Sequence, residues 1–312
     1  MTFLYILLII LLCAVLVKSA DIAIKALVFF SNYLKLSKFV IAFILAGIAT
    51  SFPEILVSIS SGIHKCSTLA LGNILGSNIA DITLILGLTI ILVKGLKTEA
   101  KVIQTNIFYT LLLVIYPIIL LLDGTLSRTD GLALIGIFLI YLLILFRQKE
   151  KFTQTYETVR RKKLLENILL FVVGMILLVL SADTIVKISN ILAVRLNTHL
   201  IIIGLFLIAV GTSLPELAFG LRAAKLQSKE MVLGNVLGSL VVNSTLALGI
   251  TSIISPIVIQ NPPTFLTSAC FMLVGLALFA IFSRTQRNLT KKEGVILLFF
   301  YITFVIVQHL IG

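Results

Sequence analysis

The chain has 312 residues, of which 59% are hydrophobic and 12% are charged, and its formal net charge is +12. Soluble domains carry about 25% charged residues, so this composition argues against a soluble protein and favours one that crosses a membrane many times. No long basic stripe with interleaved aromatic residues accompanies the charge, so we do not expect nucleic acid as a partner. Basic loops that hold a membrane protein in one orientation explain the charge better.

The apolar stretches predict an all-α membrane protein with ten transmembrane helices. A helix needs about 20 apolar residues to cross a bilayer. Residues 2–17 are assigned to the first helix rather than to a signal peptide, because no positive region precedes them and no small-residue cleavage site follows. The expected helices cover residues 2–34, 38–63, 69–93, 102–122, 131–147, 165–195, 199–222, 230–254, 264–283 and 294–311.

Lys and Arg are distributed unevenly over the loops between these segments. One set of alternate loops carries most of the 25 basic residues, including the run at residues 160–163. The other set carries Lys65, Arg128 and Arg195. Cytoplasmic loops are rich in Lys and Arg. We therefore predict a multi-pass protein of the cell (plasma) membrane with both termini on the extracytoplasmic side.

The sequence repeats itself at a spacing of 162 positions, so that residues 19–87 match residues 181–249 without a gap. The matches are polar residues and glycines in register, which chance does not produce. Each half holds five expected spans, and because five is odd the halves enter the membrane in opposite directions, as in many secondary transporters. We predict two inverted five-helix repeats, residues 1–147 and 165–312, joined by a cytoplasmic linker at 148–164.

The first repeated motif places a glutamate inside an apolar segment of each half. It reads Gly-Ile-Ala-Thr-Ser-Phe-Pro-Glu and ends at Glu54, and its counterpart Ala-Val-Gly-Thr-Ser-Leu-Pro-Glu ends at Glu216. An ionisable group inside a membrane helix is costly and is functional by default. Proline has no N–H and displaces the carbonyl one turn earlier, so each motif combines a carboxylate, the Thr50 or Thr212 hydroxyl and freed backbone oxygens. Hard oxygen ligands suit Ca²⁺ and Na⁺.

The second repeated motif lies in the next expected helix of each half. Gly-Asn-x-x-Gly-Ser ends at Ser77 and again at Ser239, and a polar residue follows each serine by four positions, Asp81 and Asn243. Residues four apart share a helix face, so each pair can face one site. Asp81 is a third acidic residue inside an apolar segment. The glycines permit close approach of helices or breaks, and they equally fit ordinary packing of small residues.

Two other acidic residues within long apolar segments are assigned a structural role. Asp21 and Asp183 each precede a lysine by four positions, Lys25 and Lys187. Opposite charges at this spacing form ion pairs on a helix surface. We therefore expect two ion pairs there rather than ion sites.

The paired motifs resemble those of the calcium/cation antiporter superfamily, and most closely those of its prokaryotic sodium/calcium exchangers. Residues 40–88 and 202–250 are similar to the paired α-repeats of that family. One Thr-Ser-x-Pro-Glu would be a weak signal, but two copies, each followed by Gly-Asn-x-x-Gly-Ser at the same spacing, are specific. The resemblance implies a secondary active antiporter without a cofactor, which exchanges Na⁺ for Ca²⁺ by alternating access at a site near the middle of the membrane.

The resemblance also implies roles for the matching residues. Glu54 and Glu216 would be shared by Ca²⁺ and Na⁺, and Thr50 and Thr212 would offer backbone carbonyls to Ca²⁺. Family members often have Asn at the first central position and Asp at the second, whereas this chain has Asp81 and Asn243. The reversal puts in question which half binds ions more tightly.

The resemblance also implies two Na⁺ sites. These would be Glu54 with Gly47 (carbonyl), Ser51 and Ser77, and Glu216 with Ala209 (carbonyl), Ser213 and Ser239.

Other functions are weighed against Na⁺/Ca²⁺ exchange. A proton/calcium antiporter of the same fold is the nearest alternative. That branch tends to carry amides at both central positions, so the carboxylate of Asp81 favours Na⁺ coupling. The preference is modest, because a carboxylate can also carry a proton. Co-transport of K⁺ and transport of Mg²⁺ are further alternatives. We expect no enzymatic activity, because His-Glu-x-x-His and Gly-x-Ser-x-Gly are absent from the sequence. The expected partners are Na⁺, Ca²⁺ and the lipid bilayer, with no obligatory protein partner evident.

Overall fold

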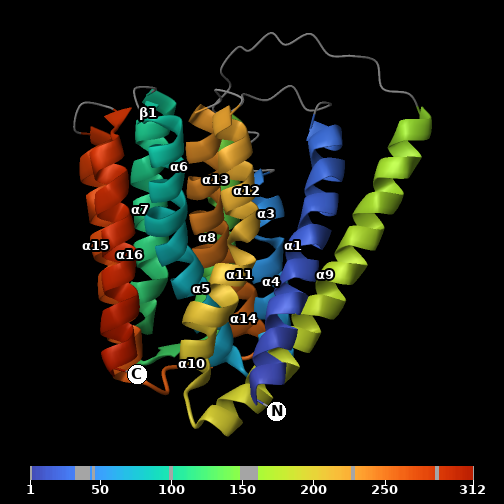
Figure 1. Ribbon diagram of the computed structural model, residues 1–312, viewed down its shortest axis with the longest axis vertical. Helices are drawn as coiled ribbons and strands as arrows, with labels where there is room; N and C mark the ends of the chain where they lie inside the picture. The colour runs from blue at the N-terminus through green and yellow to red at the C-terminus, as the bar shows by residue number, and fades with distance from the viewer. Residues whose placement is uncertain are drawn as a thin grey trace.

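The computed structural model describes residues 2–31, 43, 46–97, 101–147, 161–225, 229–284 and 288–311. Helices form nearly all of this part of the chain and stand side by side in one bundle (Figure 1). The start of the first helix and the end of the last lie at the same end of the bundle (Figure 1). The expected all-α class is confirmed.

Seven helical stretches are long and apolar enough to cross a membrane among the described residues. Shorter apolar helices occupy Phe3–Val15 and Phe52–Ile63. Parts of the expected helices at 2–34 and 38–63 fall outside the described residues, so the count of ten spans stays a prediction. The seven stretches are Ser67–Val93, Gln104–Asp123, Arg128–Leu145, Leu200–Leu221, Met231–Ile254, Pro262–Arg284 and Lys291–Ile311.

The first half contains one long helix followed by helices that are interrupted or reshaped near their middle. A break at Ser51 separates α3 from α4, and a π-helical segment, η2, joins α5 to α6. The helices of this half are α1 (Thr2–Ser31), α3 (Gly47–Thr50), α4 (Phe52–Ile63), α5 (Ser67–Ala80), η2 (Asp81–Ile85), α6 (Leu86–Val93), α7 (Lys101–Leu120), the 3-10 turn η3 (Leu121–Asp123) and α8 (Arg128–Arg147).

The second half has its interruptions in the same order. A break at Ser213 separates α11 from α12, and the π-helical segment η5 joins α13 to α14. The first helix of this half begins at Arg161, inside the expected linker 148–164. The helices are α9 (Arg161–Leu196), α10 (Leu200–Ile202), the π-helical η4 (Ile203–Ile208), α11 (Ala209–Thr212), α12 (Leu214–Lys225), α13 (Lys229–Val241), η5 (Val242–Ala247), α14 (Leu248–Ile254), α15 (Pro262–Arg284) and α16 (Lys291–Ile311).

Two short antiparallel ribbons tie loops of one half to loops of the other. β1 (Leu96–Lys97) pairs with β4 (Asn288–Leu289), and β2 (Thr125–Leu126) pairs with β3 (Ile257–Val258). In these ribbons Leu96 lies opposite Leu289 and Thr125 lies opposite Val258. The helix α7 separates β1 from β2, so the two ribbons lie at opposite ends of the bundle.

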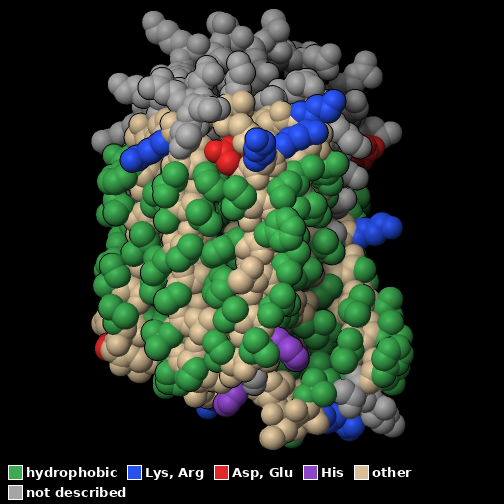
Figure 2. Space-filling model, turned by 60° about the vertical axis from the view of Figure 1, so that its left-hand side comes forward, with side chains coloured by type: hydrophobic (Ala, Val, Ile, Leu, Met, Phe, Trp, Pro, Cys, Tyr) green, Lys and Arg blue, Asp and Glu red, His purple; other side chains and the backbone are tan. Residues whose placement is uncertain are grey.

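The outer surface of the bundle is hydrophobic around its middle. Large apolar side chains such as Leu139, Leu169 and Phe299 are exposed. Figure 2 shows such side chains covering the middle of one face, with Lys and Arg gathered mainly toward one end. An apolar belt with charged rims fits a surface that faces lipid.

The expected ion pair on α9 is confirmed, since Lys187 Nζ lies 2.7 Å from Asp183 Oδ2. The other carboxylate oxygen, Asp183 Oδ1, lies 2.7 Å from His64 Nε2 and accepts a hydrogen bond from Ser60 Oγ at 3.2 Å. Asp183 therefore links α9 to the end of α4, a contact that the sequence pattern did not reveal. The side chains of Asp21 and Lys25, where we expected the matching pair, lie outside the described residues.

Candidate ion site

Each glutamate motif forms a helix break at the serine that precedes the proline. Ser51 between α3 and α4 has φ −82° and ψ 5°, and Ser213 between α11 and α12 has φ −83° and ψ 3°. Pro53 and Pro215 then lie in the first turn of the next helix, where a missing N–H costs little. The two breaks are alike because the two sequences are alike.

The breaks release backbone oxygens inside the bundle. Proline cannot donate to the carbonyl four residues earlier, so Ala49 and Gly211 lose their helical donors. The helical pattern resumes where Ile55 N donates to Ser51 O at 3.0 Å. The proline geometry therefore continues to predict available carbonyl oxygens one turn before each glutamate.

The first cluster of oxygen atoms forms around Glu54. Ser77 Oγ donates to Glu54 Oε1 at 3.3 Å and lies 3.3 Å from Thr212 Oγ1. Ser77 Oγ is also 3.5 Å from the carbonyl oxygen of Ala209. The second carboxylate oxygen, Glu54 Oε2, has no hydrogen-bond partner in the described structure. Glu54 and Ser77 of the first half thus meet Thr212 and Ala209 of the second; we call these four residues the Glu54 half-site.

A matching cluster forms around Glu216. Ser239 Oγ donates to Glu216 Oε1 at 3.1 Å and lies 3.2 Å from Thr50 Oγ1. Thr50 Oγ1 is in turn 3.5 Å from the carbonyl oxygen of Gly47. Glu216 Oε2 is also without a partner among the described atoms. Glu216, Ser239, Thr50 and Gly47 form the Glu216 half-site.

The structure groups the two backbone positions differently from our expectation. We expected Gly47 with Ser77 and Ala209 with Ser239, but Ala209 lies beside Ser77 and Gly47 lies beside Ser239. The reason is that α5 packs against α11 and α13 packs against α3, so each second motif faces the first motif of the other half. Glycine permits this approach: a Cβ atom on Gly76 would lie 2.7 Å from the Ala209 Cβ.

The remaining predicted ligands lie in the same buried region. The hydroxyls of Ser51 and Ser213 are buried and have no hydrogen-bond partner in the described structure. The side chains of Glu54, Glu216 and Asp81 are 0% exposed. Burying an unpaired carboxylate in a low-dielectric region is very unfavourable. These unpartnered oxygens therefore provide a favourable position for a cation.

The centre between the half-sites is not symmetrical. Asp81 begins η2, and neither of its carboxylate oxygens has a partner among the described atoms. Asn243 in η5 donates through Nδ2 to Asn78 Oδ1 at 3.2 Å, and Asn78 donates to Ser244 Oγ at 2.8 Å. Asp81 lies within electrostatic range of Glu216. Irregular π-helical turns often occur at functional sites.

Sequence reasoning missed several polar residues of this region. Asn78 and Ser244 contact the centre, and Asn73 and Asn235 accept hydrogen bonds from the two threonines of the half-sites. The signal was available for the last two, because both belong to the repeated Gly-Asn-x-x-Gly-Ser motif.

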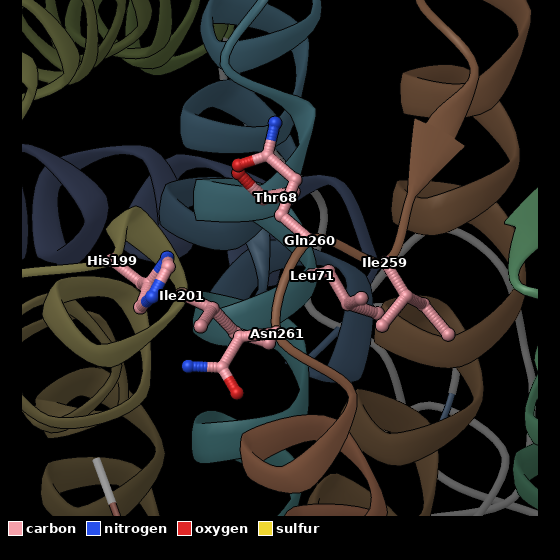
Figure 3. Close-up of a pocket in the computed structure, with 7 residues that line it drawn as sticks. All are labelled: Thr68, Leu71, His199, Ile201, Ile259, Gln260 and Asn261. Atoms are coloured by element: carbon pink, nitrogen blue, oxygen red, sulfur yellow. The ribbon is translucent and has the colours of Figure 1, made fainter.

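The acidic groups do not form a metal cluster by themselves. Within the described ranges, no three His, Cys, Asp or Glu side chains are close enough together to hold one metal ion. A cation at this site would need hydroxyl, amide and backbone oxygens as well. A separate pocket at the end of α5 is lined by none of the predicted ligands (Figure 3). Its lining residues are Thr68, Leu71, His199, Ile201, Ile259, Gln260 and Asn261.

An all-helical membrane bundle with buried carboxylates at paired helix breaks defines an ion-transporting membrane protein. The comparison with known families is more specific: the chain belongs to the sodium/calcium exchanger family, whose model, described as sodium/calcium exchanger protein, matches residues 4–147 and 166–310. The calcium/cation antiporter superfamily, which the paired motifs predicted, is confirmed. The members of this family are transporters rather than enzymes.

Individual relatives span most of the chain. The inner membrane protein YrbG of Escherichia coli is 31% identical over 83% of this chain and 82% of its own length. The sodium/calcium exchanger MaX1 of Methanosarcina acetivorans is 28% identical over 94% of this chain and 95% of its own. A solved structure of the sodium-calcium exchanger NCX_Mj, soaked with Na⁺ and Sr²⁺, has 28% identity and a TM-score of 0.71, covering 98% of this chain and 99% of that chain.

Proposed function

We propose that this protein is a secondary active antiporter that exchanges Na⁺ for Ca²⁺ at a site formed by the Glu54 and Glu216 half-sites. One observation carries the proposal: two glutamates at paired helix breaks are fully buried, and each has one oxygen held by a serine and the other without a partner. The names of MaX1 and NCX_Mj, which describe sodium/calcium exchangers, agree with this assignment.

Charge explains why such a site exchanges ions rather than conducting them. Two or three carboxylates in a low-dielectric region repel one another when the site is empty. One Ca²⁺ would neutralise two carboxylates, and several Na⁺ would neutralise two or three; because both loads use the same oxygens they exclude each other. A neutralised site can pass between the two membrane faces by alternating access, whereas an empty anionic site cannot. Obligatory exchange follows from that difference.

The ligands follow from the grouping of oxygens. Ca²⁺ would take both glutamates and the carbonyls of Thr50 and Thr212. One Na⁺ would use the Glu54 half-site and another would use the Glu216 half-site, with the buried hydroxyls of Ser51 and Ser213 as further ligands. Asp81 and Asn243 would complete the centre between them.

The architecture that supports this mechanism is a pair of inverted five-helix repeats, residues 1–147 and 165–312, with a linker at 148–164. Three features support it: the helix interruptions follow the same order in both halves, the ribbons lie at opposite ends, and the start of α1 and the end of α16 lie at the same end. The basic loops would face the cytoplasm of a plasma-membrane protein, with both termini outside.

A proton/calcium antiporter of the same fold is the second candidate, because Asp81, which argues only modestly for Na⁺, can also serve as a proton carrier. A carboxylate can bind a proton as well as a metal cation. Proton movement could then replace part of the Na⁺ load.

Reconstituted liposomes distinguish these candidates. Vesicles loaded with Na⁺ are diluted into Na⁺-free buffer, and ⁴⁵Ca²⁺ uptake is measured; a matched set carries a pH gradient and no Na⁺ gradient. We expect uptake only in the first set. Uptake driven only by the pH gradient would establish the second candidate, and uptake without any counter-ion gradient would indicate a channel.

A further inference from the structure

Two asparagines outside the predicted ligand set contact the half-sites across the two halves of the molecule. Thr212 Oγ1 lies 3.2 Å from Asn73 Oδ1, and Thr50 Oγ1 lies 3.2 Å from Asn235 Oδ1. Both asparagines are 0% exposed. The threonine contact is the one hydrogen bond that the described structure gives either amide, since the two Nδ2 atoms have no partner.

Each asparagine acts together with the serine one helical turn later. Asn73 and Ser77 lie four apart on α5, so both face Thr212, one at 3.2 Å and the other at 3.3 Å. A helix of the first half thus holds a threonine of the second half at two points. Asn235 and Ser239 on α13 hold Thr50 in the same way.

The chemistry of this contact sets the direction of the threonine hydroxyl. An amide oxygen only accepts hydrogen bonds, so the threonine must donate its hydrogen to it. The lone pairs of Thr212 Oγ1 then remain available toward Ser77 and Glu54. A hydroxyl can coordinate a cation only when its hydrogen points elsewhere, and residues behind a ligand commonly fix that orientation.

The contact also affects the backbone oxygen of the half-site. Two other acceptors lie within reach of Thr212 Oγ1, the carbonyl of Ala209 at 3.3 Å and Ser77 Oγ at 3.3 Å. A hydroxyl that donates to Ala209 would occupy an oxygen that a cation could use. By accepting the hydrogen, Asn73 leaves the hydroxyl lone pairs free and keeps the hydroxyl hydrogen off the Ala209 carbonyl, which already accepts a hydrogen bond from Ser213 N at 3.0 Å.

We propose that Asn73 and Asn235 are positioning residues that orient the Thr212 and Thr50 hydroxyls so that their oxygen atoms face the transported cation. This inference rests on the proposed function, because it assigns those hydroxyls to the ion site. It differs from a packing role: the amide acts through one threonine, so its effect disappears when that hydroxyl is removed.

A double-mutant cycle tests this dependence. We compare Asn73→Leu, Thr212→Val and the double variant, and measure the Na⁺ concentration for half-maximal ⁴⁵Ca²⁺ exchange and the rise in Tm that Na⁺ or Ca²⁺ produces in detergent. We expect Asn73→Leu to raise that concentration about fivefold. The double variant should resemble Thr212→Val alone.

Asn106→Leu is the matched control, because Asn106 is also buried and accepts a hydrogen bond from a hydroxyl, Tyr141 Oη at 2.8 Å, on helices outside the half-sites. It should leave ion dependence unchanged. Fully multiplicative effects in the double variant, or an Asn73→Leu protein that binds ions normally, would overturn the inference. If Asn73→Leu fails to fold, Asn235→Leu with Thr50→Val tests the mirrored contact.

Failure of the proposed function gives a different result. In that case the wild-type protein shows no Na⁺-driven Ca²⁺ uptake. The ion-induced rise in Tm still measures cation binding. It therefore shows whether the effect of Asn73→Leu on binding depends on the Thr212 hydroxyl.

Discussion

The two half-sites are close copies of each other, whereas the centre between them is not. In both half-sites a serine donates to a glutamate, at 3.3 Å and 3.1 Å, and a threonine donates to an asparagine of the other half at 3.2 Å. In the centre Asp81 is matched by Asn243, and Asn78 is matched by Leu240. The two half-sites therefore share one geometry, whereas the centre carries a charge in the first half only.

Because of this difference, the third carboxylate, Asp81, belongs to the first half only, although the two half-sites are otherwise symmetrical. Asp81 interacts electrostatically with Glu216, and Glu54 interacts with both. An additional negative charge increases the repulsion within the empty site, so more positive charge is needed to neutralise it. The symmetrical glutamates should therefore be indispensable, and the unsymmetrical aspartate should determine how many cations or protons accompany them.

Replacing either glutamate should have the largest effect. Glu54→Gln and Glu216→Gln each remove a charge that both ions need, so we expect Na⁺-driven ⁴⁵Ca²⁺ uptake to fall at least about 100-fold in each case. Glu166→Gln, which changes an exposed glutamate on α9, is the control. Comparable uptake by wild type and both site variants would contradict the assignment of the half-sites, and loss in only one would show that they are not equivalent.

Changing the centre should have an intermediate effect. We expect Asp81→Asn to reduce Na⁺-driven uptake about tenfold, because the site then has one negative charge fewer for the bound cations to neutralise. The paired exchange Asp81→Asn with Asn243→Asp moves the charge to the other half and should restore most of the uptake. A paired variant as inactive as Asp81→Asn would show that the position of the charge matters, and an unaffected Asp81→Asn would remove the aspartate from the mechanism.

Removing the polar contact at the end of α4 should have the smallest effect. Asp183 is partly exposed and pairs with Lys187 and His64. Exposed ion pairs contribute about 0.2–1 kcal/mol, so Asp183→Asn should lower the free energy of unfolding by less than about 1 kcal/mol. The Na⁺ dependence of uptake should stay the same. A changed Na⁺ dependence would show that α9 influences the half-sites through this contact.

Much of the site could be predicted from the sequence because its signals are local. The Pro-Glu pairs mark the helix breaks, and Ser77 and Asp81 share a face because they are four residues apart. The duplication adds a second copy of each signal at a constant spacing. These inferences need only the geometry of a single helix.

The contacts between helices could not be predicted in this way. The partners of Thr212 and Thr50 lie on α5 and α13, in the opposite half of the sequence, and no local pattern indicates which helix faces another. The glycines at positions 76 and 238 were consistent with several kinds of packing. Their role became clear only where α5 meets Ala209 and α13 meets Gly47.

The sequence by itself therefore determined the membrane class, the two helix breaks and the carboxylates beside them, because periodicity, proline geometry and the cost of buried charge act within one segment. Only the tertiary structure decided that each glutamate shares its half-site with a threonine of the other repeat. The physical reason is that a buried hydroxyl takes its partner from whichever helix packs against it, and packing depends on the shapes of both surfaces.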